Sequence, residues 1–245
     1  MPVTKSQVKY IQSLGHKKFR DAEGVFVVEG PKITGELLDA SNLRPRAVYA
    51  LPGWIGELPV SLRSAVTAVS EPELERLSGL TTPNQVVAIF EKPVFPAPVL
   101  DKGILLALDG IQDPGNLGTI LRLADWFGLS TIVCSTDSAD VYNPKAIQST
   151  MGSIARVQVL YADPAVLIRG SGMPVYAALL EGEGLYGIGK IDKGWLLIGN
   201  ESKGIRPELQ ALATKRVTIP RIGQAESLNA AVATGIILSH LVGEH

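Results

Sequence analysis

The sequence predicts an α/β protein with a small N-terminal α/β domain and a larger C-terminal domain built on a mostly parallel sheet. Apolar runs alternate with helix-like segments from residue 104 onward, which is typical of a parallel sheet covered on both faces. Shorter elements fill residues 5–90. Between the two, Lys92-Pro-Val-Phe-Pro-Ala-Pro98 holds three prolines and indicates a stiff linker. We therefore expect domains over 1–91 and 100–245, joined by a linker over 92–99.

The N-terminal domain begins with a predicted helix over 5–15, because Val8, Ile11 and Leu14 recur at three-residue spacing. A turn is expected over 20–24. Apolar runs and the breaks between them predict the remaining elements. These are strands over 25–28, 47–50, 65–69 and 86–90, and helices over 32–40 and 71–77.

The C-terminal domain reads as a regular strand–helix alternation. The predicted strands cover 104–108, 131–134, 157–160, 175–180, 194–198 and 215–219. The predicted helices cover 116–127, 144–150 and 163–169, with a short one around Leu209. A last helix is expected from Leu228, with Ser227 as its N-cap. Ligands of such sheets bind outside the carboxyl ends of the strands.

Composition describes a folded globular protein: of 245 residues, 46% are hydrophobic and 19% are charged. The net charge of −1 is unremarkable, but its distribution is uneven. The first twenty residues contain five cations and no carboxylate, and the cations are Lys5, Lys9, Lys17, Lys18 and Arg20. Such a patch can neutralise phosphates, and its alternative interpretation is the solvated face of an amphipathic helix.

Several classes of protein are excluded or disfavoured. No apolar run approaches the roughly 20 residues that cross a bilayer, and the N-terminus lacks the apolar core of a secretory signal. A single cysteine, Cys134, sits in a strand-like run, which excludes a disulfide framework and fits a reducing cytoplasm. The three histidines, His16, His240 and His245, are scattered. We expect a cytoplasmic protein with no membrane segment and no metal.

Three predicted strands end in glycine-containing polar loops. Leu108 runs into 109–118, Ile198 into 199–204, and Ile219 into 220–229. Glycines permit a close approach of backbone to a ligand. Gly118 is followed by Thr119-Ile120 where a P-loop requires lysine and a hydroxyl residue, and the three-glycine dinucleotide fingerprint is missing. The loops therefore argue against ATP and NAD.

Together these loops resemble the SpoU/TrmH family (SPOUT superfamily) of RNA ribose 2′-O-methyltransferases. The matching segments in the C-terminal domain are Asp113-Pro-Gly-Asn-Leu-Gly-Thr-Ile-Leu-Arg122, Ile147-Gln-Ser-Thr-Met-Gly-Ser153, Ile198-Gly-Asn-Glu-Ser-Lys-Gly204, and Ile219-Pro220 with Ser227-Leu-Asn229. Lys17-Lys-Phe-Arg20, Gly24-Val-Phe-Val-Val-Glu-Gly30 and Thr81-Thr-Pro-Asn-Gln85 resemble the family's accessory substrate-binding domain. Asn84-Gln85 departs from the pattern, because Gln-Gly is more typical there, and Arg221 stands where an apolar residue is common.

The resemblance implies a C-terminal domain tied into a deep trefoil knot and an S-adenosyl-L-methionine (AdoMet) cofactor. It implies a homodimer whose site lies near the subunit interface, and an N-terminal domain that binds structured RNA. The accessory domain and its basic start favour rRNA over tRNA. Of the tryptophans, Trp54, Trp126 and Trp195 are expected in the core or at an interface, and Trp126 is the candidate for the dimer contact.

Residue roles follow from the same resemblance. The expected catalytic residues are Asn116, Arg122, Glu201, Ser227 and Asn229; the expected cofactor contacts are Leu179, Gly199, Ile219 and Leu228; the expected RNA contacts are Lys17, Lys18 and Arg20. The family's proposed base is Arg122, but a guanidinium is always charged in proteins, so we expect a clamp on a phosphate oxygen. Helix capping by Asn116 and a helix-start acid at Glu201 are the structural alternatives.

Two other functions stay open from the sequence. One is a non-catalytic RNA-binding or assembly factor that keeps the fold, against which the complete set of polar residues argues. The other is methylation of a base nitrogen on the same scaffold.

Overall fold

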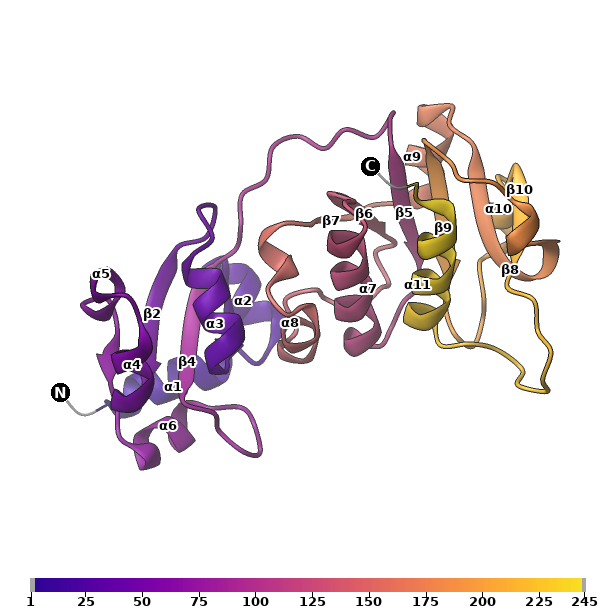
Figure 1. Ribbon diagram of the computed structural model, residues 1–245. Coiled ribbons are helices and arrows are strands. Elements are labelled where there is room, and N and C mark those ends of the chain that lie inside the picture. Colours follow the sequence, from indigo (N-terminus) through magenta and orange to yellow (C-terminus); the bar gives the residue numbers. More distant parts are fainter. Residues whose placement is uncertain (1–2, 244–245) are drawn as a thin grey trace. The chain divides into compact units, whose positions relative to one another are not determined.

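The structure is a computed structural model that describes residues 3–243 (Figure 1). The chain forms two compact units. The first comprises Met1–Phe95 together with Tyr142–Ala155, and the second comprises Pro96–Val141 together with Arg156–His245. The segment 142–155 therefore folds with the N-terminal unit, although the chain on both sides of it belongs to the second.

The first unit is built on a four-stranded sheet of order β1-β4-β2-β3. The strands are β1 (Val25–Glu29), β2 (Pro45–Ala50), β3 (Thr67–Ala68) and β4 (Val86–Glu91). β4 runs antiparallel to both β1 and β2, whereas β2 and β3 are parallel. The helices are α1 (Lys5–Ser13), α2 (Lys17–Glu23), α3 (Pro31–Leu38), α4 (Pro52–Glu57), α5 (Val60–Arg63), α6 (Glu71–Leu77) and α8 (Pro144–Thr150), followed by the 3-10 turn η1 (Ser153–Ala155). Val8, Ile11 and Leu14 are buried as predicted.

The predicted turn over 20–24 is wrong, because α2 continues to Glu23 and ends at Gly24, whose φ is 65°. Arg20 anchors this helix: its side chain is only 1% exposed, and its Nη1 donates to the carbonyls of Leu14 and Gly15 at 2.8 Å each. The prediction that Arg20 contacts RNA is corrected accordingly. A guanidinium held inside by backbone carbonyls is not available to a phosphate.

The sequence pattern does not predict α4 and α5, and the strand expected over 65–69 shrinks to Thr67–Ala68. Both helices are short, with six and four residues, and α4 contains Gly53 and Gly56, which lower its helix propensity. Proline at the first helical position starts α4. Such short segments carry too little periodicity to be recognised.

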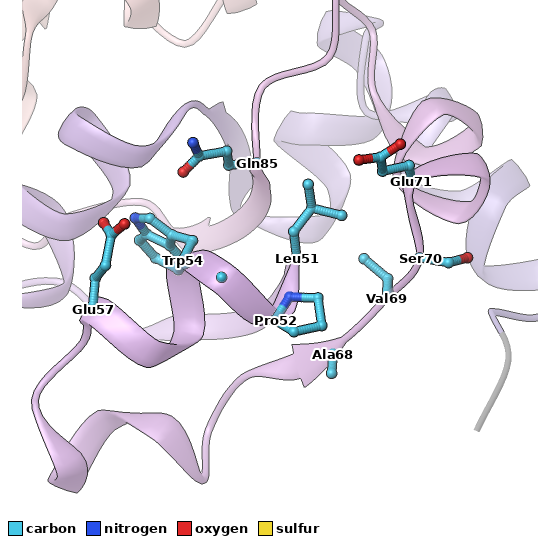
Figure 2. Close-up of a pocket in the computed structure, with 10 residues that line it drawn as sticks. Leu51, Pro52, Trp54, Glu57, Ala68, Val69, Ser70, Glu71 and Gln85 are labelled. Atoms are coloured by element: carbon cyan, nitrogen blue, oxygen red, sulfur yellow. The ribbon is translucent and has the colours of Figure 1, made fainter.

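Gln85 has an unusual backbone conformation just before β4. Its φ is 53°, a value that side chains other than glycine rarely adopt. Figure 2 shows Gln85 on the border of a cavity of 580 Å³, across from Trp54 and Pro52. The glycine that is more typical of the family at this position would occupy the same conformation without strain.

The second unit contains a six-stranded sheet of order β10-β8-β9-β5-β6-β7, and every neighbouring pair in it is parallel. The strands are β5 (Ile104–Asp109), β6 (Thr131–Cys134), β7 (Gln158–Tyr161), β8 (Val175–Gly184), β9 (Gly194–Gly199) and β10 (Lys215–Thr218). The helical elements are α7 (Pro114–Trp126), α9 (Pro164–Ser171), η2 (Leu185–Gly187), α10 (Pro207–Gln210) and α11 (Ala230–Leu241). The expected parallel sheet is confirmed.

Helices cover both faces of this sheet. Alternate residues of β5, β8 and β9 pack with α9 and α10 in one core cluster that includes Trp195, Ile168 and Leu209. The intervening residues of the strands face α7 and α11, which lie side by side in Figure 1. Cys134 is buried in this core, and desolvation raises the pKa of its thiol to about 12, which fits a packing residue rather than a nucleophile.

Pairing within the sheet brings two of the three glycine loops together. Asp109, the last residue of β5, lies opposite Gly199, the last residue of β9. The loops that follow both strands therefore leave the sheet at neighbouring points of its carboxyl edge. Within residues 3–243, no helix has both the length and the apolar character required to cross a membrane.

Candidate active site

Three side chains from the three loops form a hydrogen-bonded chain, which we call the amide relay: Asn229, Asn116 and Glu201. Asn229 Nδ2 donates to Asn116 Oδ1 at 2.9 Å, and Asn116 Nδ2 donates to Glu201 Oε1 at 2.5 Å. The partners lie 113 and 85 residues apart in the sequence, respectively. The fold therefore assembles this site from the carboxyl edge of the sheet, as parallel sheets commonly do.

Asn116 enters the relay from the first turn of α7. This helix begins at Pro114 rather than at the predicted Asn116, and Asp113 is its N-cap, with Oδ1 accepting from the Asn116 N–H at 2.8 Å. Capping by Asn116, the alternative role for this residue, is therefore wrong. Its side-chain amide stays available for Glu201 and Asn229.

Asn229 has two simultaneous functions. Its Oδ1 accepts from the N–H groups of Ala231 and Val232 at 2.9 and 3.2 Å, which makes it the N-cap of α11. The predicted start at Leu228 with Ser227 as N-cap is wrong by two residues. Because Oδ1 is held by the helix start, Nδ2 faces Asn116, and the direction of donation along the whole relay is fixed.

Glu201 lies in the turn between β9 and α10, and α10 begins only at Pro207. Its alternative interpretation, an acid at a helix start, is therefore wrong. The half-buried carboxylate instead accepts the relay's last hydrogen bond. A charged acceptor makes this hydrogen bond stronger than one between neutral groups.

A cavity of 690 Å³ opens beside the relay, within the size range of roughly 300–1,000 Å³ typical of small-molecule sites. All four predicted cofactor contacts line it, and so do two of the predicted catalytic residues: Leu179, Gly199, Ile219, Leu228, Glu201 and Ser227. Ser227 is exposed in the loop before α11. The cavity wall combines apolar side chains with the backbone of two glycine-containing loops.

Gly199 shows how closely the backbone approaches itself at this wall. A Cβ added there would overlap the backbone of Gly204 and Ile205, so no other residue fits without moving the loop. A wall that combines apolar residues such as Leu179 and Leu228 with polar ones such as Glu201 and Ser227 suits a ligand with polar ends and an apolar body. AdoMet has this character, and the residues present therefore fit it.

Arg122 is not part of the amide relay. It lies on α7 with its side chain exposed, and within residues 3–243 no hydrogen bond or ion pair of its guanidinium is recorded. The structure thus brings Asn116, Glu201 and Asn229 together, puts Ser227 at the cavity, and leaves Arg122 facing solvent.

The two predicted RNA contacts that remain after the correction of Arg20 lie on α2. Lys17 is exposed and pairs with Asp21, which also receives Lys92 Nζ at 2.7 Å. These two lysines hold the pKa of Asp21 below its ordinary value. Lys18 is exposed as well. Lys17 and Lys92 are therefore both paired with Asp21, and Lys18 is the other exposed lysine of α2.

Sequence reasoning missed three residues that shape the site: Asp109, Asp113 and Arg206. Asp113 could have been recognised, because an aspartate directly before proline combines a favoured N-cap with a favoured first helical residue. Asp109 is buried at the end of β5 and bonds to Arg206. Nothing in the sequence pairs these two residues, which lie 97 positions apart.

Comparison with known proteins agrees with this geometry. Residues 103–239 match the SpoU rRNA Methylase family, and residues 5–88 match the MRM3-like substrate binding domain. The chain is 30% identical over 246 residues to the 23S rRNA (guanosine(2553)-2'-O)-methyltransferase RlmP of Bacillus subtilis (strain 168), covering 97% of this chain and 96% of that relative.

Solved structures lead to the same family. An AdoMet-bound rRNA methyltransferase from Sinorhizobium meliloti superimposes with a TM-score of 0.84 at 31% identity, covering 97% of this chain and 94% of that one. The SpoU methyltransferase AviRb from Streptomyces viridochromogenes, in complex with AdoMet, gives a TM-score of 0.82 at 27% identity, with 96% of each chain covered. The family match spans more than half of this chain and includes every residue of the amide relay. The resemblance noted in the sequence is thus confirmed, and the chain belongs to the SpoU rRNA methylase family.

Proposed function

We propose that this chain is an AdoMet-dependent methyltransferase that methylates a ribose 2′-hydroxyl of rRNA. The observation that carries the proposal is the amide relay beside a cavity lined by Leu179, Gly199, Ile219 and Leu228. Family membership and the names of relatives such as RlmP support ribosomal RNA as the substrate.

AdoMet, when bound, supplies a methyl group that its sulfonium charge already activates. The protein then has to orient the ribose hydroxyl, receive or pass on its proton, and exclude water. Leu179, Gly199, Ile219 and Leu228 are proposed to hold the cofactor. Backbone groups of the two loops supply most of the polar contacts, because the side chains at these four positions are apolar or absent.

The relay residues orient the ribose. Each side-chain amide carries two N–H groups, and the relay uses one of each, so Asn116 and Asn229 both keep a donor for a sugar oxygen. Glu201 fixes Asn116 through Oε1, and its second carboxylate oxygen takes no part in the relay. Ser227 adds a hydroxyl at the cavity edge. A fixed direction of hydrogen bonding means that little reorganisation is required when substrate arrives.

Arg122 is proposed to hold a phosphate oxygen of the RNA. A guanidinium remains protonated and presents parallel N–H donors, which suits a clamp on phosphate and not a base. The phosphate oxygen held in this way takes the proton of the 2′-hydroxyl. The exposure of Arg122 supports this role, because a cation without an internal partner is available to a substrate.

The N-terminal residues 1–91 are proposed as the RNA substrate-binding domain, 92–99 as a linker, and 100–245 as the methyltransferase domain. The match of residues 5–88 to a substrate binding domain supports this division. Lys17 and Lys18 are the proposed phosphate contacts. We also propose a cytoplasmic homodimer whose C-terminal domain carries the family's trefoil knot. The exposed Trp126, 79% accessible on α7, supports a contact between subunits at that helix.

Methyl transfer from labelled AdoMet to purified rRNA tests the function directly. Digestion to nucleosides followed by mass spectrometry should place the methyl group on ribose. A methylated nucleobase would refute the ribose assignment, and no transfer at millimolar cofactor would favour an RNA-binding factor without turnover. Sedimentation of wild type and Trp126→Glu reports on the dimer, and we expect the variant to dissociate.

A further inference from the structure

We propose that Arg206 and Asp109 are positioning residues that lock the loop 199–206 onto the end of β5. Their bond keeps Glu201 within reach of Asn116 and keeps the cofactor cavity in shape. The inference rests on the proposed function for its catalytic consequence, but its structural consequence concerns the free protein alone.

The contact between the two residues is made at three points. The backbone N–H of Arg206 donates to Asp109 Oδ2 at 2.7 Å, and its Nε donates to Oδ1 at 2.6 Å. Nη2 lies 2.5 Å from the same Oδ1. Both carboxylate oxygens are therefore used: the backbone N–H, which other residues would keep, binds Oδ2, and the two guanidinium nitrogens bind Oδ1, which a single point charge such as lysine does not reproduce.

The environment of the pair makes it strong. Asp109 is 2% exposed, so its charge has little water around it and depends on Arg206 for compensation. Arg206 is partly exposed, and two further carboxylates face it: Asp137 Oδ1 is 3.8 Å from Nη2 and Glu208 Oε1 is 3.8 Å from Nε. The hydrogen bond to Asp109 is the main cause that raises the pKa of Arg206 above its ordinary value.

A second connection ties the other end of the loop to the same strand end. Asn200 Nδ2 donates to the carbonyl of Gly110 at 2.7 Å. Asn200 Oδ1 accepts from the N–H groups of Ser202 and Lys203 at 2.9 and 3.0 Å, which folds the loop into a compact turn. Asn200 also exchanges two backbone hydrogen bonds with Gly204, at 3.1 and 2.9 Å.

Glu201 sits between these two anchor points, directly after Asn200 and five residues before Arg206. Its carboxylate accepts a hydrogen bond from Asn116, and Asn116 lies in α7, the helix that follows β5. Residues 199–205 also form part of the cavity wall. Loss of the Arg206 guanidinium leaves this end of the loop held to Asp109 by the backbone N–H alone, so both the relay and the cavity change together.

The test compares Arg206→Ala with a matched control, Arg156→Ala. Arg156 lies in the same unit, makes a comparable contact to Asp125 with Nη2 at 2.8 Å, and is 46% exposed against 44% for Arg206. Hydrogen exchange of the Ser202, Lys203 and Gly204 amides in the cofactor-free protein is the first readout. We expect exchange to accelerate about tenfold in Arg206→Ala and not in the control.

Cofactor affinity and kinetics give the second and third readouts. We expect the AdoMet dissociation constant, measured by calorimetry, to rise about tenfold in Arg206→Ala. We expect kcat to fall about tenfold while the KM for RNA is unchanged, because the Arg206 guanidinium is directed at Asp109. Arg206→Lys should recover only part of each loss. Asp109→Asn, which keeps the shape of the side chain, should give the same pattern and serves if Arg206→Ala does not fold.

The outcomes separate the two proposals. Exchange rates and AdoMet affinity in Arg206→Ala that equal those of Arg156→Ala would overturn the positioning role. If exchange is faster in Arg206→Ala, and the wild-type protein binds AdoMet but transfers no methyl group to rRNA, the positioning role stands and the proposed reaction is refuted. The double variant Asn116→Ala with Arg206→Ala should show a fold-loss in kcat smaller than the product of the two single fold-losses, because both substitutions act through the relay. A fold-loss equal to that product would refute action through the relay.

Discussion

Asn229 joins the starts of two helices: its Oδ1 caps α11 while its Nδ2 donates to Asn116 Oδ1 on α7 at 2.9 Å. The helix cap and the proposed catalytic contact therefore use different atoms of one side chain. Asn229→Ser should keep the cap, because serine is also a favoured N-cap, but it is too short to hold Asn116. We expect unchanged melting temperature and at least a tenfold lower kcat.

Asn229→Ala is the companion variant. It removes the cap as well as the relay, so we expect the free energy of unfolding to fall by about 1 kcal/mol in addition to the kinetic loss. Urea denaturation and single-turnover kinetics on both variants measure the two effects. Full activity in Asn229→Ser would show that the relay is not needed for methyl transfer.

Arg122→Ala should abolish methyl transfer and leave AdoMet affinity unchanged, because Arg122 lies outside the cavity lining and is proposed to hold RNA phosphate. Arg122→Lys should retain part of the rate, since a positive charge remains but the paired donors are lost. Calorimetry with AdoMet and a methyl-transfer assay on the same preparations test this. Turnover retained in Arg122→Ala would remove this residue from the mechanism.

The double variant Lys17→Glu and Lys18→Glu should weaken RNA binding and reduce the slope of log affinity against log salt by about one to two units. Lys102→Glu with Lys193→Glu is the control of equal charge change. These two exposed lysines precede β5 and β9, at the edge of the sheet opposite the site. If RNA affinity falls equally in both double variants, the lysines of α2 do not contact RNA specifically.

Gln85→Gly should stabilise the protein by about 0.5–1 kcal/mol. A non-glycine residue in the left-handed region costs roughly 1–2 kcal/mol, and glycine costs roughly 0.5–1 kcal/mol in lost chain entropy. Asn84→Gly is the control, because among residues 3–243 the positive φ values outside glycine are those of Gln85 and Met151. Asn84→Gly should lower the free energy of unfolding. A loss of stability in Gln85→Gly, measured in urea, would show that the side chain's contacts in the cavity of Figure 2 outweigh the strain.

Glu73 predicts how the N-terminal unit responds to acid. Its carboxylate accepts from the backbone N–H groups of Ser70 and Val3, which lowers its pKa from 4.5 to about 2. A lowered pKa means that Glu73 contributes stability above pH 4.5 and loses that contribution as the pH falls toward 2. Glu73→Gln should therefore melt earlier at pH 7, with a difference from wild type that disappears near pH 2. Glu75→Gln, on the exposed side of α6, should melt like wild type throughout.

Much of the fold follows from local patterns. The strands 104–108, 131–134 and 194–198 were recognised within one residue because each is a short apolar run bounded by breaks, and burial on both faces demands such runs. Where the pattern is weak, prediction was wrong. The helix α2 depends on Arg20 reaching two carbonyls, which is a tertiary contact that no periodicity reveals.

The site was predicted through motif residues and not through geometry. Asn116, Glu201 and Asn229 were selected by resemblance, and the hydrogen bonds that join them depend on strand order, which the sequence does not state. Helix starts were displaced by two residues at both α7 and α11, because several residues in each loop are suitable caps. The pairing of Asp109 with Arg206 depends on β5 and β9 being neighbours, which the sequence does not state.

The sequence separation within the amide relay also sets when the site can mature during synthesis. Asn116 leaves the ribosome 113 residues before Asn229, a delay of about 6–23 s at ordinary elongation rates. During that interval the first motif is present but has no partner to fix its amide. A translation product that stops before Asn229 consequently lacks the complete amide relay, and the relay forms only once Asn229 has been synthesised.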